Sequence, residues 1–113
     1  MKLPYRELAE VPERKITHYL LNPGHPAGGS KAAFFLRLGF RMDDWERLSV
    51  ALLEHANENH VATSHESDYG TRHVVEGPLT APDGTHLNIR CVWFIEIGDK
   101  TPRLVTAYPL SKP

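Results

Sequence analysis

Two segments of this sequence carry side chains that could act together on a phosphate group. Near the end of the chain, Thr106 and Tyr108 are separated by one residue within a mostly apolar run. Residues two apart in a β-strand point to the same face of a sheet, so these hydroxyls would lie side by side. Far upstream, His25 and Lys31 lie on a stretch rich in glycine and proline. If the fold joins the two segments, they supply an acid–base group, a cation and two hydroxyls, a set suited to phosphoryl transfer without a metal ion.

Each of these four residues also has a purely structural interpretation. His25 could be a solvent-exposed loop histidine, although its ordinary pKa near 6.5 would let it accept or donate a proton near neutrality. Lys31 falls at the start of an expected helix, where a cation opposes the helix dipole. A bound anion would explain that placement, and an ordinary surface lysine is the alternative. Thr106 and Tyr108 belong to residue types that favour strands for packing reasons alone.

Arg90 and Tyr69 are candidate substrate-binding residues. Arg90 falls on the polar side of an alternating segment that should pair with the last strand, so it could neighbour Thr106 or Tyr108 and anchor a phosphate. The alternative is that Arg90 simply belongs to the solvated face of a strand. Tyr69 lies in a turn between two expected strands, which gives it a position from which it could contact substrate.

No cofactor or metal ion is expected. Residues 29–31 read Gly-Ser-Lys and follow no strand, so they do not form the Gly-Lys-Ser/Thr phosphate loop of nucleoside triphosphate-binding proteins. The one cysteine, Cys91, falls in an apolar strand and is expected to be a buried, inert thiol. Five histidines match no zinc-binding spacing, and we interpret them as surface residues. They are His55, His60, His65, His73 and His86.

Length and composition indicate one globular domain spanning residues 1–113. A chain of 113 residues is long enough to bury a single core, and 41% hydrophobic with 24% charged residues are ordinary globular values. The formal net charge of −1 excludes a polyanion-binding protein held by a broadly basic surface. Contact with a nucleic acid would therefore depend on a local patch of cations.

The sequence predicts a soluble protein of a reducing compartment, which we take to be the cytoplasm. Its first residues contain no apolar signal core, and no run is long enough to cross a bilayer, so no membrane contact is expected. The lone cysteine fits a compartment in which disulfides are rare. Export by a route that leaves no cleavable signal is compatible with the same observations.

Helical patterns precede strand patterns along the chain, which predicts an α+β fold. Apolar spacing and turn residues predict helices at 12–21, 31–38 and 43–57, and strands at 61–66, 71–79, 85–97 and 102–110. In the first helix, Ile16, Tyr19 and Leu20 form the apolar stripe. Pro82-Asp83-Gly84 is a hairpin signal that precedes residues 85–97, where apolar and polar residues alternate. Ser30 is the expected N-cap of the second helix, and Asp43 with Glu46 is a capping-box pattern for the third. We expect two or three N-terminal helices packed on a four-stranded antiparallel meander. One face of this sheet would be buried by the helices and the other would be free to build a site.

The chain also resembles a family of small bacterial proteins of unknown function. The resemblance is specific and covers nearly the whole sequence. The matching runs are Tyr19-Leu20-Leu21-Asn22, His25-Pro26 with Gly28, Lys31-Ala32 with Phe34-Phe35, Leu38-Gly39-Phe40, Tyr69-Gly70-Thr71, Val75-Glu76-Gly77-Pro78-Leu79 and Leu104-Val105-Thr106-Ala107-Tyr108-Pro109. Members of this family are often encoded beside a small partner protein, in a toxin–antitoxin-like arrangement. The resemblance therefore implies a cognate protein partner.

More distantly, the order of elements resembles the barnase/EndoU/colicin/RelE-like group of metal-independent RNases. The ending Thr106-Ala107-Tyr108-Pro109 is similar to that of RNase A-like toxin domains of contact-dependent inhibition systems. In those domains a histidine, a basic residue and a Thr-x-Tyr pair form the active site. The resemblance implies these roles for His25, Lys31, Thr106 and Tyr108. The chain departs from the pattern in having lysine rather than arginine as the cation, which loses the bidentate fork.

These observations lead to the hypothesis of a metal-independent endoribonuclease toxin domain. A ribose 2′-OH of an RNA such as tRNA would attack the neighbouring phosphate and leave a 2′,3′-cyclic phosphate. A small antitoxin or immunity protein would be its partner. The alternative is a non-catalytic protein-binding or immunity-type module on the same fold, which the polar strand expected at 61–66 would suit as a pairing edge. A third possibility is a member that keeps the fold and has lost activity.

Overall fold

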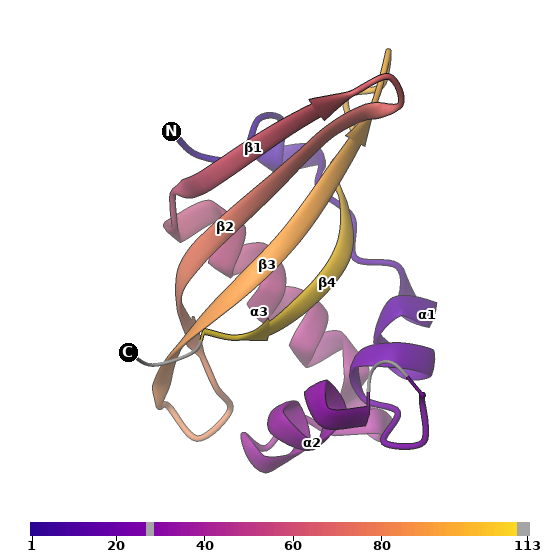
Figure 1. The fold of residues 1–113 in the computed structure, drawn as a ribbon. Helices are drawn as coiled ribbons and strands as arrows, with labels where there is room; N and C mark the ends of the chain where they lie inside the picture. The colour runs from indigo at the N-terminus through magenta and orange to yellow at the C-terminus, as the bar shows by residue number, and fades with distance from the viewer. Residues whose placement is uncertain (27–28, 111–113) are drawn as a thin grey trace.

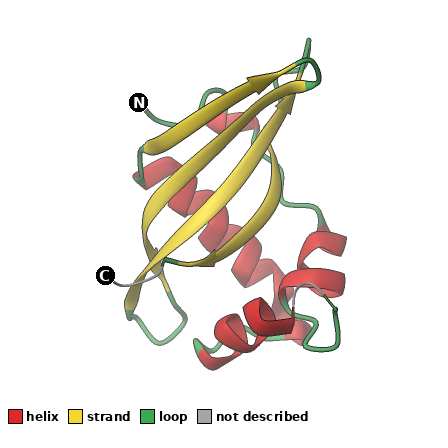
Figure 2. Ribbon diagram, in the orientation of Figure 1, coloured by secondary structure: helices red, strands yellow, loops and turns green. Residues whose placement is uncertain are grey.

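The computed structural model describes residues 1–26 and 29–110 of the chain. Helical elements come first and strands follow, which confirms the α+β prediction (Figures 1 and 2). The helical elements are η1 (Arg6–Leu8), α1 (Glu13–Lys15), η2 (Ile16–Leu20), α2 (Gly29–Arg37), η3 (Met42–Asp44) and α3 (Trp45–Glu58). The strands are β1 (Val61–Ser67), β2 (Gly70–Thr80), β3 (His86–Glu96) and β4 (Arg103–Pro109).

The strands form the antiparallel meander that the sequence predicts. Their order in the sheet is β1-β2-β3-β4, so each strand pairs with the next one along the chain. A bulge interrupts the last pairing, because Val92 lies opposite Thr106 whereas Trp93 lies opposite Leu104. The bulge leaves Val105 as an extra residue in β4. It allows Leu104 and Thr106 to face opposite sides of the sheet.

The hydrophobic core lies between α3 and one face of the sheet. In Figure 1, α3 runs behind the strands. Leu48 and Leu52 of α3 are four residues apart and fully buried, as the apolar stripe of an amphipathic helix should be. From the sheet, Cys91 and Trp93 of β3 are also fully buried in this core. The prediction of a buried thiol at Cys91 is therefore confirmed, and burial raises the pKa of this thiol.

The short helical elements α1, η2 and α2 gather beside β4, as Figure 1 shows. The predicted helix at 12–21 is split between α1 and a π-helical turn, in which the Leu21 N–H donates to the carbonyl of Ile16. Such turns are rare and are often found at functional sites. The loop after η2 returns to the start of α2, where a Cβ on Gly29 would lie 2.8 Å from the Pro23 carbonyl oxygen. This glycine therefore permits the close approach of α2 to the loop.

Two predicted helix caps do not form. α2 begins at Gly29, so Ser30 lies inside the helix instead of capping it. At the start of α3 there is no side-chain cap, because the Asp43 carboxylate accepts two hydrogen bonds from Arg41 at 2.9 and 2.8 Å. The helix instead starts from the 3-10 turn η3. Because the Asp43 carboxylate is bound to Arg41, it does not accept a hydrogen bond from the backbone of Glu46.

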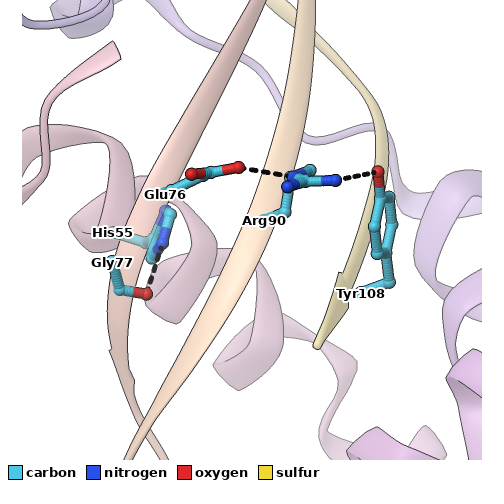
Figure 3. A network of polar contacts seen from close by, with 5 residues as sticks. All are labelled: His55, Glu76, Gly77, Arg90 and Tyr108. Carbon is cyan, nitrogen blue, oxygen red and sulfur yellow. Dashed lines mark hydrogen bonds and ion pairs between the residues drawn. The ribbon is translucent and has the colours of Figure 1, made fainter. Parts of the chain in front are cut away.

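The prediction that the histidines lie on the surface is wrong for His55 and His73. His55 continues the apolar stripe of α3 and its Nε2 lies 3.1 Å from the carbonyl oxygen of Gly77 on β2 (Figure 3). Burial lowers its pKa, although hydrogen bonds to backbone carbonyls act in the opposite direction. His73 is 6% exposed, and its Nδ1 lies 2.7 Å from the Ser64 hydroxyl across the β1–β2 pair. Both rings therefore serve packing between elements.

Candidate active site

The hydroxyl of Tyr19 joins three elements at one point. Lys31 of α2 donates a hydrogen bond from Nζ to this hydroxyl at 2.8 Å. The Thr106 hydroxyl of β4 lies 3.0 Å from it on a second side, and either hydroxyl can be the donor. Tyr19 itself comes from the π-helical turn η2. The structure thus connects the upstream loop and helix to the last strand through a tyrosine.

Tyr108 extends this cluster across the sheet. Arg90 of β3 lies directly opposite Tyr108 in the strand register. Its Nη1 donates to the Tyr108 hydroxyl at 3.4 Å, and its Nε donates to the Glu76 carboxylate of β2 at 2.6 Å (Figure 3). Lys31 Nζ lies 5.8 Å from the Tyr108 ring centroid, and the Arg90 guanidinium carbon lies 5.6 Å from it. Two cations therefore contact one tyrosine ring, at distances typical of cation–π contacts.

The pKa of the Tyr19 hydroxyl lies below its ordinary value. Burial alone would raise this pKa, but hydrogen bonds with Lys31 and Thr106 and the positive charges of Lys31 and Lys15 lower it further than burial raises it. Lys15 contributes from α1, with Nζ 5.2 Å from the Tyr19 ring centroid. A hydroxyl held among cations in this way accepts negative charge more readily than a free phenol. The position suits binding of an anion or transfer of a proton.

His25 lies beside this cluster. Its ring packs edge-on against the Tyr19 ring, with centroids 5.0 Å apart and an angle of 77° between the planes. Its backbone is held in the loop, because the His25 N–H donates to Asn22 and the His25 carbonyl accepts from Gly29. The imidazole is therefore close to Tyr19, which in turn contacts Lys31.

Two surface hollows adjoin the cluster. A hollow of about 500 Å³ lies between α2 and the end of β4 and includes Lys31 and Tyr108 in its lining. A second, of about 450 Å³, lies between α1, η2 and the following loop and includes Tyr19 and His25. The hydrogen bond from Lys31 to Tyr19 connects the two linings. The two hollows therefore lie on either side of the contact between Lys31 and Tyr19.

The structure brings five of the six predicted site residues into one network. His25, Lys31, Thr106 and Tyr108 are linked through Tyr19 and through the contact of Lys31 with the Tyr108 ring, and Arg90 joins at Tyr108. The remaining predicted residue lies elsewhere. Tyr69 occupies the β1–β2 turn, where it is 80% exposed. It is about 23 Å from Glu76 along the chain, at the usual rise of a strand.

Three residues of the network were not expected from the sequence. The apolar spacing of the first helix predicts that Tyr19 packs in the core. Its role in the network depends on polar partners of its hydroxyl, Lys31 and Thr106, that are distant in the sequence. Glu76 lies opposite Arg90 in the register, a pairing that strand alternation could have suggested. Lys15 precedes Tyr19 by four residues, so helical spacing alone would place the two on one face. The spacing of Lys15 and Tyr19 is visible in the sequence, whereas the polar partners of the Tyr19 hydroxyl are visible only in the folded structure.

Neither a metal-binding cluster nor a membrane-spanning helix occurs in residues 1–26 and 29–110. Within that part of the chain, no three His, Cys, Asp or Glu side chains are grouped so that they could hold a metal ion. None of the helices described there is long and apolar enough to cross a bilayer.

Comparisons with known proteins include a solved complex with a similar fold. A chain of the contact-dependent growth inhibition toxin–immunity protein complex from Klebsiella pneumoniae 342 matches with a TM-score of 0.73 and 16% sequence identity. The match covers 96% of this chain and 98% of that chain, and at this identity it shows a shared fold. No curated protein matches the sequence. The family model described as domain of unknown function DUF6883 matches residues 2–111. Since that match spans nearly the whole sequence, the chain belongs to the DUF6883 family.

Proposed function

We propose that this domain is an RNA-cleaving toxin that uses no metal ion. The observation that carries the proposal is the position of Lys31, whose ammonium lies at the Tyr19 hydroxyl and against the Tyr108 ring. The hydroxyl of Thr106 also contacts Tyr19, and the guanidinium of a second cation, Arg90, contacts the hydroxyl of Tyr108. This arrangement offers positive charge and hydrogen-bond donors where a phosphate could be held, which is the main requirement for phosphoryl transfer.

The reaction we propose is attack of a ribose 2′-OH on the adjacent phosphate. His25 accepts the proton of the 2′-OH as the O2′–P bond forms. Lys31 and Arg90 stabilise the negative charge that develops on the phosphate oxygens. The P–O5′ bond then breaks and the leaving oxygen takes a proton from Tyr108. The products are a 2′,3′-cyclic phosphate and a 5′-hydroxyl.

Thr106 and Tyr19 have supporting roles in this proposal. The Thr106 hydroxyl binds a phosphate oxygen, because it lies on the same sheet face as Tyr108. Tyr19 fixes the ammonium of Lys31 and the hydroxyl of Thr106 relative to each other through its two hydrogen bonds. It therefore acts as a positioning residue for both groups. A site built on strands and helices in this way holds its groups in a defined geometry.

The fold is compatible with a toxin and equally with an immunity module. The similar solved chain belongs to a complex of a growth inhibition toxin with its immunity protein. By analogy, a small cognate antitoxin or immunity protein would block this domain until it reaches RNA, such as tRNA, in the cytoplasm. Analogy of fold alone does not fix an activity, so the site residues carry the chemical part of the proposal.

Incubation of the purified protein with total tRNA in excess EDTA tests the activity. We expect fragments to accumulate with wild-type protein, and to disappear or fall strongly with His25→Ala and with Lys31→Gln. Lys100→Gln is the matched control, because Lys100 is an exposed lysine in the β3–β4 connection. Absence of fragments with wild-type protein, or equal cleavage by all variants, would contradict the proposed activity.

One observation favours a second function, that of a protein-binding module. Six of the seven residues of the edge strand β1 are exposed, and among the described residues this strand pairs only with β2. An exposed edge can accept a strand from another chain. This second function would be supported over the first by two results together. The domain would bind its cognate partner tightly through β1, and it would leave tRNA intact in the assay above.

A further inference from the structure

One face of α2 lines the larger hollow. Ser30, Phe34 and Arg37 recur at spacings of four and three residues, so they share a face of the helix. The core-facing residues of α2 are Ala32 and Phe35, both fully buried. Phe34 is only half-buried, and its ring meets the Phe35 ring edge-on at 5.1 Å. Phe34 packs partly against the edge of the core and also lines the hollow, whereas Arg37 of the same lining is exposed.

The opposite wall of this hollow is the end of β4. Tyr108 and Pro109 contribute flat, largely apolar surface there. Lys31 belongs to the same lining, and its ammonium also reaches Tyr19 in the proposed active site. The hollow and the phosphate-binding groups are therefore continuous. A volume of about 500 Å³ is within the range of pockets that bind small organic groups.

We infer that this hollow is a nucleobase subsite, which takes one unpaired base of the RNA next to the phosphate held at Lys31. Aromatic rings and an arginine guanidinium are the surfaces on which proteins stack unpaired bases. Phe34 supplies the ring and Arg37 the guanidinium. A base within a double helix has both faces covered by its neighbours and cannot enter. The substrate class is therefore a single-stranded loop or end of RNA, and the inference rests on the proposed function.

Binding of an RNA that cannot be cleaved tests the subsite separately from catalysis. The probe is a fluorescently labelled single strand of about 12 nucleotides with mixed sequence, 2′-O-methylated at every ribose, so that it lacks the attacking 2′-OH. Fluorescence anisotropy measures its Kd. We expect Phe34→Leu, which keeps an apolar side chain but removes the ring, to raise the Kd about fivefold or more. A blunt duplex of the same strand should bind more weakly than the single strand.

Arg37→Gln provides a second variant that carries no risk to folding, because Arg37 is exposed. It should also weaken binding of the single strand. Arg6→Gln is its matched control, since Arg6 is an exposed arginine on η1, which packs against α3. This control should bind the probe as the wild-type protein does. Together the two arginine variants separate a local contact from a loss of general positive charge.

The outcomes distinguish this inference from the proposed function. If tRNA is cleaved in EDTA but neither Phe34→Leu nor Arg37→Gln changes the Kd, the subsite is refuted and the cleavage proposal survives. If the two variants weaken binding but no cleavage occurs, the subsite stands and the cleavage proposal fails. If the wild-type protein binds no single-stranded probe, or prefers the duplex, the subsite is overturned.

Discussion

The hydroxyls of Tyr19 and Thr106, 87 residues apart in the sequence, lie 3.0 Å from each other. This contact holds the π-helical turn η2 against the last strand. Lys31 reaches the same tyrosine from α2. The candidate site is thus assembled by tertiary structure from the two ends of the chain. Loosening any of these contacts should affect activity more than stability, because the groups lie at the surface of the core and not inside it.

Tyr19→Phe tests the positioning role of this hydroxyl. The change keeps the ring and its packing but leaves Lys31 and Thr106 without their shared partner. We expect the rate of tRNA cleavage to fall by about tenfold or more, since misplacement of catalytic groups costs rate steeply. The free energy of unfolding should change by only about 1 kcal/mol, the usual net value of one hydrogen bond. Cleavage assays and urea unfolding of the same preparation measure both quantities. A large loss of stability with unchanged cleavage would refute the role.

Arg90→Lys tests whether the guanidinium is needed at the Tyr108 hydroxyl. Lysine keeps the charge but cannot contact Glu76 and Tyr108 at once with a planar fork. We expect reduced cleavage with little loss of stability, because the Arg90–Glu76 pair is partly exposed, with 38% and 30% of the side chains accessible. Urea unfolding should show a change within about 1 kcal/mol. If Arg90→Lys cleaves tRNA at the rate of the wild-type protein, the guanidinium of Arg90 has no role in the proposed reaction.

Gly77→Ala tests the packing of β2 on α3. A Cβ at position 77 would overlap the side chain of Asn59. The Asn59 amide is fixed by hydrogen bonds to the carbonyls of His55 and Pro78 at 2.9 and 3.1 Å, so it has no free space to move into. We expect a loss of about 1–3 kcal/mol in unfolding free energy, the usual cost of overpacking. Gly24→Ala is the control, because among the described residues a Cβ there would meet only the Asn22 side chain, at 3.4 Å. Equal stability of the two variants would contradict this account of the interface.

Acid should destabilise the protein partly through His55. Burial lowers the pKa of this histidine in the folded state, so the unfolded chain, with a pKa near 6.5, binds the proton more readily. The contribution of His55 to the free energy of unfolding is therefore fully present above the pKa of the unfolded state. It is lost as the pH falls through the lower pKa of the folded state. We expect the free energy of unfolding to decrease as the pH falls below about 6.5, and to decrease less in a His55→Gln protein. An identical pH dependence of the two proteins would show that His55 is not the group responsible.

The sequence was most informative about the sheet. Alternation along residues 85–97 and the Pro82-Asp83-Gly84 turn predicted the pairing of β2, β3 and β4, and hence the neighbourhood of Arg90 and Tyr108. The meander constrains these positions because successive antiparallel strands lie side by side. The sequence left open whether Arg90 neighbours Thr106 or Tyr108, and the structure places it opposite Tyr108.

The sequence was less informative about the helical segment. Helical spacing assigned Tyr19 to the apolar stripe, yet its hydroxyl is the polar centre of the site, because the π-helical turn η2 faces the edge of the sheet. The burial of His55 could not be told from its residue type, since its acceptor is a backbone carbonyl on a distant strand. Which face of a short helix meets which strand is decided by packing, and no local pattern records it.

The chemistry of the RNA ends tests the central claim most directly. Mass spectrometry of tRNA fragments produced in excess EDTA identifies the group at each new 3′ end. The proposed attack by the 2′-OH predicts 2′,3′-cyclic phosphates paired with 5′-hydroxyls, present with wild-type protein and with Lys100→Gln and strongly reduced with Lys31→Gln. Fragments that end in 3′-hydroxyls, or cyclic phosphates formed equally well by Lys31→Gln, would contradict it.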